Sequence, residues 1–213
     1  MSEYDGGKEK MIEIVLVVLL LIWNFGVSAW NAYAVGSNWA RIEATGGLFG
    51  KIMLWCGWLM SAIGFTWCYL FLIGFIMHIV GWLDQEAVSA MFSLGYLIII
   101  IPALGTGLII TINSWMNAYK ERSVGNFAIA TYNTSAQFYN SYRALSAIPE
   151  ALKNVIEFFA KSGGGSGGKR DGKGAAGILV IIALIIAIAL GIFTTQFIAD
   201  WAADKAESNS GRK

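Results

Sequence analysis

Polar side chains inside long apolar segments are the residues of this 213-residue sequence that could do chemistry. Asn24, Ser28 and Asn31 stand at i, i+4 and i+7, so a helix would place all three on one face. An amide without a hydrogen-bond partner is costly in lipid, and this face should therefore turn towards another helix or towards water. Three interpretations stay open: hydrogen bonding between helices, the lining of a pore or ligand site, and a position at the membrane interface.

Side chains typical of catalysis and metal binding are sparse. His78 is the only histidine, and one histidine cannot by itself build a zinc site or a histidine-based triad. The sequence contains no His-Glu-x-x-His motif and no phosphate-binding Lys-Ser/Thr loop. The apolar segments also lack the charged residues that mark proton relays and coupled-ion sites. We therefore expect a protein that is not an enzyme and that holds no cofactor and no metal.

Four long windows without Asp, Glu, Lys or Arg must position these side chains: residues 14–40, 52–83, 87–119 and 174–199. A helix needs roughly 20 apolar residues to cross a bilayer, and each window is longer than that. Overall, 56% of the residues are hydrophobic and 14% are charged, whereas a soluble domain carries about a quarter charged residues. The sequence predicts an all-α, polytopic helical membrane protein with about four transmembrane helices, and it excludes soluble, fibrous and disordered classes.

Changes in composition divide the chain into four parts. Residues 1–116 should form a three-helix transmembrane region with a short N-terminal tail, in which residues 35–50 connect the first two spans. Residues 117–161 should form an extramembrane amphipathic helical region, with the third helix continuing to about Ala147 and Pro149 breaking it. Residues 162–177 hold eight glycines and read as a flexible tether, or as a laboratory linker. Residues 178–213 should form the fourth transmembrane helix and a polar tail.

Small residues at helical spacing indicate where helices approach each other. The second span carries one such stripe and the fourth span another, and both would let a neighbouring backbone come close. The two cysteines, Cys56 and Cys68, lie about 18 Å apart along one helix and are predicted to be packing residues, not a disulfide. The predicted packing residues are Gly57, Ser61, Gly64, Ala183, Ala187 and Gly191.

A proline interrupts the third span. Pro102 frees a backbone carbonyl and bends the helix axis, and Gly105 and Gly107 make the same point deformable. A static kink for packing and a gating hinge both fit this pattern.

An amphipathic stripe follows the third span. Phe127, Phe138 and Tyr142 recur at helical spacing, and we predict that they bind a partner chain. Asn133 and Gln137 would then be available for the wetter side of the same helix.

The distribution of Lys and Arg predicts both termini outside and the long connection, residues 117–176, on the cytoplasmic side. The expected function is that of a structural or scaffolding subunit of a membrane assembly. The alternative is a homo-oligomeric pore lined by polar faces of the first and third spans, with Thr106, Thr111 and Asn113 on the third. An enzyme or electron carrier that shares its cofactor with another chain is a third class. Expected partners are the lipid bilayer and other membrane protein chains or copies of this one; the net charge of +1 argues against nucleic acid.

Overall fold

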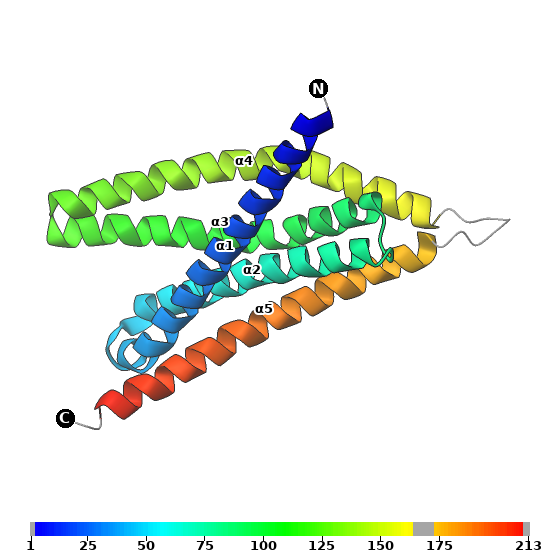
Figure 1. The fold of residues 1–213 in the computed structure, drawn as a ribbon. Helices are drawn as coiled ribbons and strands as arrows, with labels where there is room; N and C mark the ends of the chain where they lie inside the picture. The colour runs from blue at the N-terminus through cyan, green and yellow to red at the C-terminus, as the bar shows by residue number, and fades with distance from the viewer. Residues whose placement is uncertain (1–2, 164–172, 211–213) are drawn as a thin grey trace.

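Every element of the computed structural model, which describes residues 3–163 and 173–210, is a helix, in agreement with the predicted all-α class. The helices are α1 (Glu3–Thr45), α2 (Gly47–Ile79), α3 (Gln85–Glu121), α4 (Val124–Gly163) and α5 (Lys173–Ser210), as Figure 1 shows. Four of them are long and apolar enough to cross a membrane: α2, α3, Val15–Thr45 of α1 and Gly174–Asn209 of α5. The chain is therefore an integral membrane protein. Most of the predicted tether, residues 162–177, lies outside the described residues.

Short caps end the helices where the chain must turn. At the turn from α2 to α3, Asp84 is the N-cap of α3, and its carboxylate accepts a hydrogen bond of 2.8 Å from the Ala87 backbone amide. Gly47 has a φ of +57° where α2 begins directly after α1. Helix α1 itself continues to Thr45, so residues 35–45 are helical and are not part of the predicted connection.

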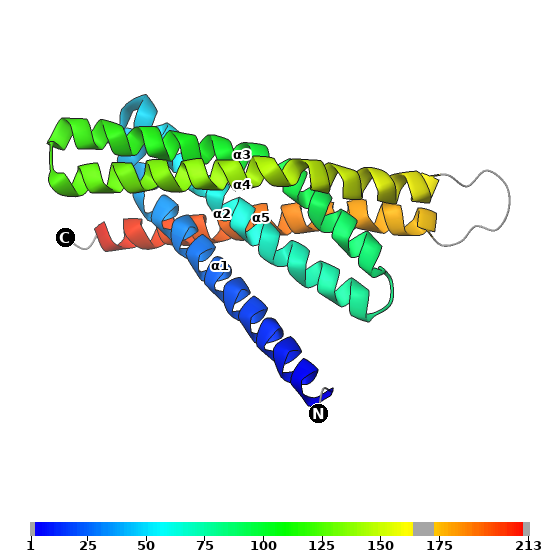
Figure 2. The same cartoon turned by 90° about the horizontal axis from the view of Figure 1, so that it is seen from above.

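The third span does not continue to Ala147 as predicted, because the chain reverses at residues 122–123. Arg122 adopts the left-handed conformation, with a φ of 46°, and its amide closes α3 by a 2.9 Å bond to the Ala118 carbonyl. The Ser123 hydroxyl then accepts a hydrogen bond from the Asn126 amide in the first turn of α4. From there α4 returns antiparallel alongside α3, as Figures 1 and 2 both show. This arrangement does not match the predicted extramembrane position of residues 117–161.

Pro149 lies inside α4 and does not end it, contrary to the sequence prediction. The helix continues because α3 binds it on both sides of the proline. The Tyr96 hydroxyl donates to the Ala144 carbonyl at 2.6 Å, and the Asn154 amide donates to the Ser93 hydroxyl at 3.3 Å. These contacts hold both halves of α4 along the same neighbour.

The main apolar core lies between α2, α3 and α5 and includes Leu70, Met91 and Val180, with Phe158 of α4 covering one end. The N-terminal half of α1 diverges from this bundle (Figure 2), and the side chains of residues 15–23 are mostly exposed. Such a helix suits lipid or another protein, because water would leave its apolar surface uncovered.

Helices α1, α3 and α5 run in one direction through the bundle, and α2 and α4 run in the other (Figure 2). The ion pair between Lys161 and Glu86 places the end of α4 beside the start of α3. Near the opposite end, Gly36 of α1 packs directly on Ala199 of α5. The two ends of α4 therefore lie at opposite ends of α3.

Candidate functional site

The polar stripe of α1 faces the small-residue stripe of α2. The Asn24 side-chain amide donates to the Gly64 carbonyl at 3.1 Å, and the Ser61 hydroxyl donates to the Ser28 carbonyl at 2.7 Å. Ser61 also lies 3.3 Å from the Thr195 hydroxyl, so α5 joins the same contact. We call this contact the α1–α2–α5 seam. Its polar groups satisfy one another, as groups removed from water must.

Small residues bring the backbones of the seam together. A methyl group at Gly64 would overlap the Ser28 side chain, and one at Gly191 would lie 2.8 Å from the Ala62 carbonyl oxygen. One at Gly57 would lie 2.8 Å from Val35. Ala183 and Ala187, also predicted as packing residues, are fully buried in the core.

Asn31 is the member of the polar stripe that the seam does not use. It is half-buried on α1. Among the described residues, the α1 groups that hydrogen-bond across the seam are the Asn24 side chain, as donor, and the Ser28 carbonyl, as acceptor. Conversely, sequence reasoning missed Gly36. A methyl group there would lie 2.7 Å from the Ala199 Cα atom, so α1 and α5 nearly touch at this point. The available signal was a glycine flanked by small and apolar residues.

A second polar contact joins α3 to α4, and we call it the α3–α4 seam. Its hydrogen bonds cross from side chains of one helix to side chains or carbonyls of the other, along most of their length. The pairs are Ser114–Asn133 (2.5 Å), Trp115–Thr134 (2.8 Å), Leu104–Gln137 (3.1 Å), Tyr96–Ala144 (2.6 Å) and Ser93–Asn154 (3.3 Å).

The predicted hinge of α3 lies in this second seam. Gly107 leaves room for Gln137, because a methyl group there would overlap the Gln137 side-chain amide. Gln137 uses this position to donate to the Leu104 carbonyl, within a few residues of Pro102. Gly105, by contrast, has nothing within 4 Å of its Cβ position. The segment around Pro102 is thus bridged by α4 at Gly107 and has open space at Gly105.

The outer face of α4 carries the three aromatic residues predicted to bind a partner. Phe127, Phe138 and Tyr142 are 43%, 77% and 68% exposed. Asn133 and Gln137, which the sequence reading made available to the wetter side, instead face α3 and bind it. These two amides of the helix therefore contact the bundle, while its buried side chains, Ala130, Ala151 and Phe158, are apolar.

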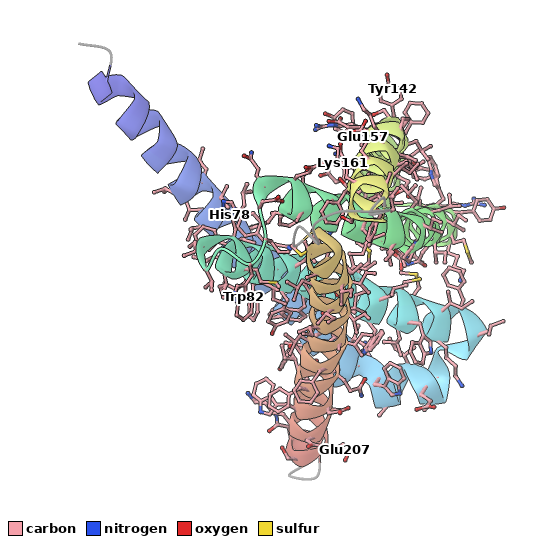
Figure 3. All side chains as sticks on the ribbon, turned by 90° about the vertical axis from the view of Figure 1, so that its right-hand side faces the viewer. His78, Trp82, Tyr142, Glu157, Lys161 and Glu207 are labelled. Atoms are coloured by element: carbon pink, nitrogen blue, oxygen red, sulfur yellow. The ribbon has the colours of Figure 1, made fainter. Side chains whose placement is uncertain are left out.

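Ionisable groups gather at the end of the bundle where α4 ends, and Figure 3 labels Lys161 and His78 among them. The Lys161 ammonium lies 2.6 Å from the Glu86 carboxylate, and this hydrogen bond and its charge raise the pKa of Lys161. His78 contacts the Leu83 carbonyl at 3.0 Å across the α2–α3 turn. Cys56 and Cys68 are buried free thiols. No group of three or more His, Cys, Asp or Glu side chains able to hold a metal occurs among the described residues.

No protein-family model, curated protein or solved structure matches this chain. The function therefore has to be argued from the two seams and from the surfaces that they leave exposed.

Proposed function

We propose that this protein is a non-enzymatic structural subunit of a larger membrane assembly, and that it contacts a partner chain through the outer face of α4. The observation that carries the proposal is the placement of side chains along residues 124–142 of this helix. The Asn133 and Gln137 amides hydrogen-bond to α3, whereas Phe138, Tyr139 and Tyr142 point outward and are more than half exposed.

A helix packed against a protein surface in water normally shows the opposite arrangement, with apolar residues inside and amides outside. Aromatic side chains outside and hydrogen-bonded amides inside suit a surrounding without water. Residues 124–142 contain no charged side chain, and as a helix they extend about 28 Å, close to the thickness of a bilayer core. The first half of α4 therefore fits a position beside α3 within the membrane.

Lipid alone would cover this face poorly. Tyr132 and Tyr142 carry hydroxyl groups on it, and Asn140 adds an exposed amide. Moving a hydroxyl or amide group from water to hydrocarbon without a hydrogen-bond partner costs free energy, on the order of 4–8 kcal/mol for transfer to cyclohexane. Another protein chain can supply both apolar contacts and hydrogen bonds, so we infer a protein partner, whether a second copy or a different chain.

The polar groups inside the bundle support a structural role over a pore. Asn24 and Ser28 are residues that the pore hypothesis would place in the pore lining. The Asn24 side chain and the Ser28 carbonyl instead hydrogen-bond to α2. Thr106 and Thr111 donate to carbonyls of their own helix at 3.0 and 2.9 Å. The Asn24 and Ser28 bonds join α1 to α2, the threonine bonds lie within α3, and each of these groups has a partner in the protein.

The test compares two pairs of exposed aromatic residues at the same i, i+4 spacing. Replacing Phe138 and Tyr142 on α4 by alanine should release the chain from its assembly, while it still inserts in the membrane. The control pair, Phe193 and Phe197 on α5, is 67% and 64% exposed, and its replacement should leave the assembly intact.

Assembly size is measured by sedimentation velocity after extraction in a mild detergent. Central interface aromatics typically contribute 2 kcal/mol or more each, so we expect at least about 30-fold weaker association per residue in the α4 variant. An α4 variant that sediments like the wild-type assembly would refute the proposal.

A further inference from the structure

A cavity of about 310 Å³ lies between α1, α2 and α5, near the end of the bundle where α1 meets α2. Neither of the two seams includes it. Three indole rings, one carboxylate and one amide border it, together with small residues of α1 and α5. The lining residues are Gly36, Trp39, Trp55, Trp58, Gln196, Ala199, Asp200 and Ala203.

The indole rings form walls that stand at steep angles to each other. The centroids of Trp39 and Trp55 are 5.6 Å apart with an interplanar angle of 79°, and those of Trp55 and Trp58 are 5.9 Å apart with an angle of 68°. Rings stacked in parallel would cover each other's faces. Rings set near a right angle can instead direct more than one face or edge towards the same enclosed space.

A chain of hydrogen bonds fixes the polar side of the cavity. The Trp58 indole N–H donates to the side-chain oxygen of Gln196 at 3.2 Å, and the side-chain amide nitrogen of Gln196 donates to the Asp200 carboxylate at 2.8 Å. One of the three walls is thereby tied to the carboxylate. None of the eight lining residues is cationic, and Asp200 takes part in no ion pair with the described residues.

The close contact of α1 and α5 brings these groups together. Gly36 lets the α1 backbone rest on Ala199 of α5, and Trp39 and Asp200 lie three residues and one residue further along the two helices. A side chain at position 36 would separate the helices and widen the cavity between the ring and the carboxylate.

We propose that this cavity binds an alkylated ammonium group, such as the trimethylammonium group of a lipid headgroup or of a free solute. The faces of indole rings attract cations, and tryptophan does so more strongly than tyrosine or phenylalanine. Aromatic walls also suit the methyl groups of such a cation, whereas a hydrated metal ion would need oxygen ligands in place of rings. The carboxylate balances the charge. Tryptophan favours the level of lipid headgroups, which makes the cavity reachable by either source.

A cation already lies over an indole ring nearby on α5. The Lys205 ammonium lies 5.0 Å from the centroid of the Trp201 ring, and neither residue lines the cavity. The same kind of contact is therefore used on this surface, while the cavity itself has three rings and no cation of its own.

The first experiment measures binding of choline to the full chain in a maltoside detergent by isothermal titration calorimetry. The matched ligand is 3,3-dimethylbutan-1-ol, which has the shape of choline without its charge. We expect wild-type protein to bind choline at least about tenfold more tightly than the neutral analogue. Two results would overturn the proposal without any variant. One is equal affinity for the two ligands. The other is no choline binding together with no selective retention of phosphatidylcholine in the mass spectrometry experiment described below.

Variants then locate the site. Asp200→Asn keeps an oxygen that can accept from Gln196 but removes the charge, and Trp55→Leu removes one wall; each should weaken choline binding at least about tenfold. The controls are Asp204→Asn, one turn further along α5, and Trp23→Leu, an exposed indole on α1. Binding that persists in both site variants, or that is lost equally in the controls, would also refute the assignment.

The source of the cation is resolved by native mass spectrometry from nanodiscs containing equal amounts of phosphatidylcholine and phosphatidylglycerol. Selective retention of phosphatidylcholine by the wild type, lost in Asp200→Asn, identifies a lipid headgroup. Choline binding without selective lipid retention identifies a free solute. Both results support an alkylammonium site, and neither depends on assembly through α4.

Discussion

Replacing Gly36 by alanine is expected to destabilise the protein by about 2 kcal/mol. The added methyl group would lie 2.7 Å from both Cα and the carbonyl carbon of Ala199, whereas ordinary contacts begin at 3.4 Å. The methyl group would also overlap the carbonyl oxygen of Ala199, so the two helices would have to move apart by more than about 0.7 Å at this point. Backbone atoms of a helix cannot rotate out of the way as a flexible side chain can.

The magnitude follows from two opposing effects. Overpacking in a well-packed interior costs about 1–3 kcal/mol, and a clash with rigid backbone belongs near the upper end of that range. Alanine in place of glycine recovers about 1 kcal/mol of helix propensity. The difference is a loss of about 2 kcal/mol, or about a 30-fold decrease in the folding equilibrium constant.

Gly26→Ala is the matched control, because Gly26 lies on the same helix and has nothing within 4 Å of its Cβ position. That substitution should leave the free energy of unfolding unchanged or raise it by up to about 1 kcal/mol. Both variants are measured by circular dichroism during unfolding in mixed micelles of dodecyl maltoside and sodium dodecyl sulfate. If the Gly36 variant is as stable as the Gly26 variant, the close contact between α1 and α5 does not exist as described.

Three other perturbations address the seams and the charged end of the bundle. Alanine at Asn133 and at Ser114, singly and together, should give a coupling energy of about 0.6 kcal/mol in the same unfolding assay, and zero coupling would contradict the 2.5 Å hydrogen bond. Ser28→Cys, in a background without the native cysteines, should stay unmodified by a water-borne maleimide. A cysteine placed in the α3–α4 turn is the control that the same reagent should label. Labelling at position 28 would place this face of α1 beside water. Because Glu86 raises the pKa of Lys161 above 10.5, the stabilisation from this pair is present below that value and lost as the pH rises through the raised pKa. Glu86→Gln should remove this alkaline step from the melting temperature measured against pH, and an unchanged step would assign it to other groups.

The apolar windows predicted the helical class and the four candidate spans, because length and the absence of charge are local properties. The start of α3 also carries a local signal, because Asp84 is an acidic N-cap residue. The reversal after α3 could not be predicted as easily. It depends on Arg122 in a left-handed conformation that any sequence pattern would sooner assign to glycine. Ser123, a good N-cap residue, was the local signal for a new helix.

The orientation of α4 shows a different limit. A period of 3.6 residues separates an aromatic side from an amide side, but it does not say which side faces the bundle. Gln137 binds α3 because Gly107, thirty residues away in sequence, leaves space for it. Gly36 and Trp39 were assigned to a connection for a related reason: Arg41 suggested the end of a span, whereas α1 continues to Thr45. Contacts between distant segments decide these points, and no single segment records them.

Native mass spectrometry of the protein, extracted gently from its own membrane, tests the central claim most directly. The account predicts a complex of one defined mass, larger than the 23.1 kDa of the single chain, that dissociates when Phe138 and Tyr142 are replaced by alanine. A uniform multiple of 23.1 kDa would identify copies of this chain as the partner, and other masses would identify different subunits. A single 23.1 kDa chain accompanied by lipid alone would contradict the account.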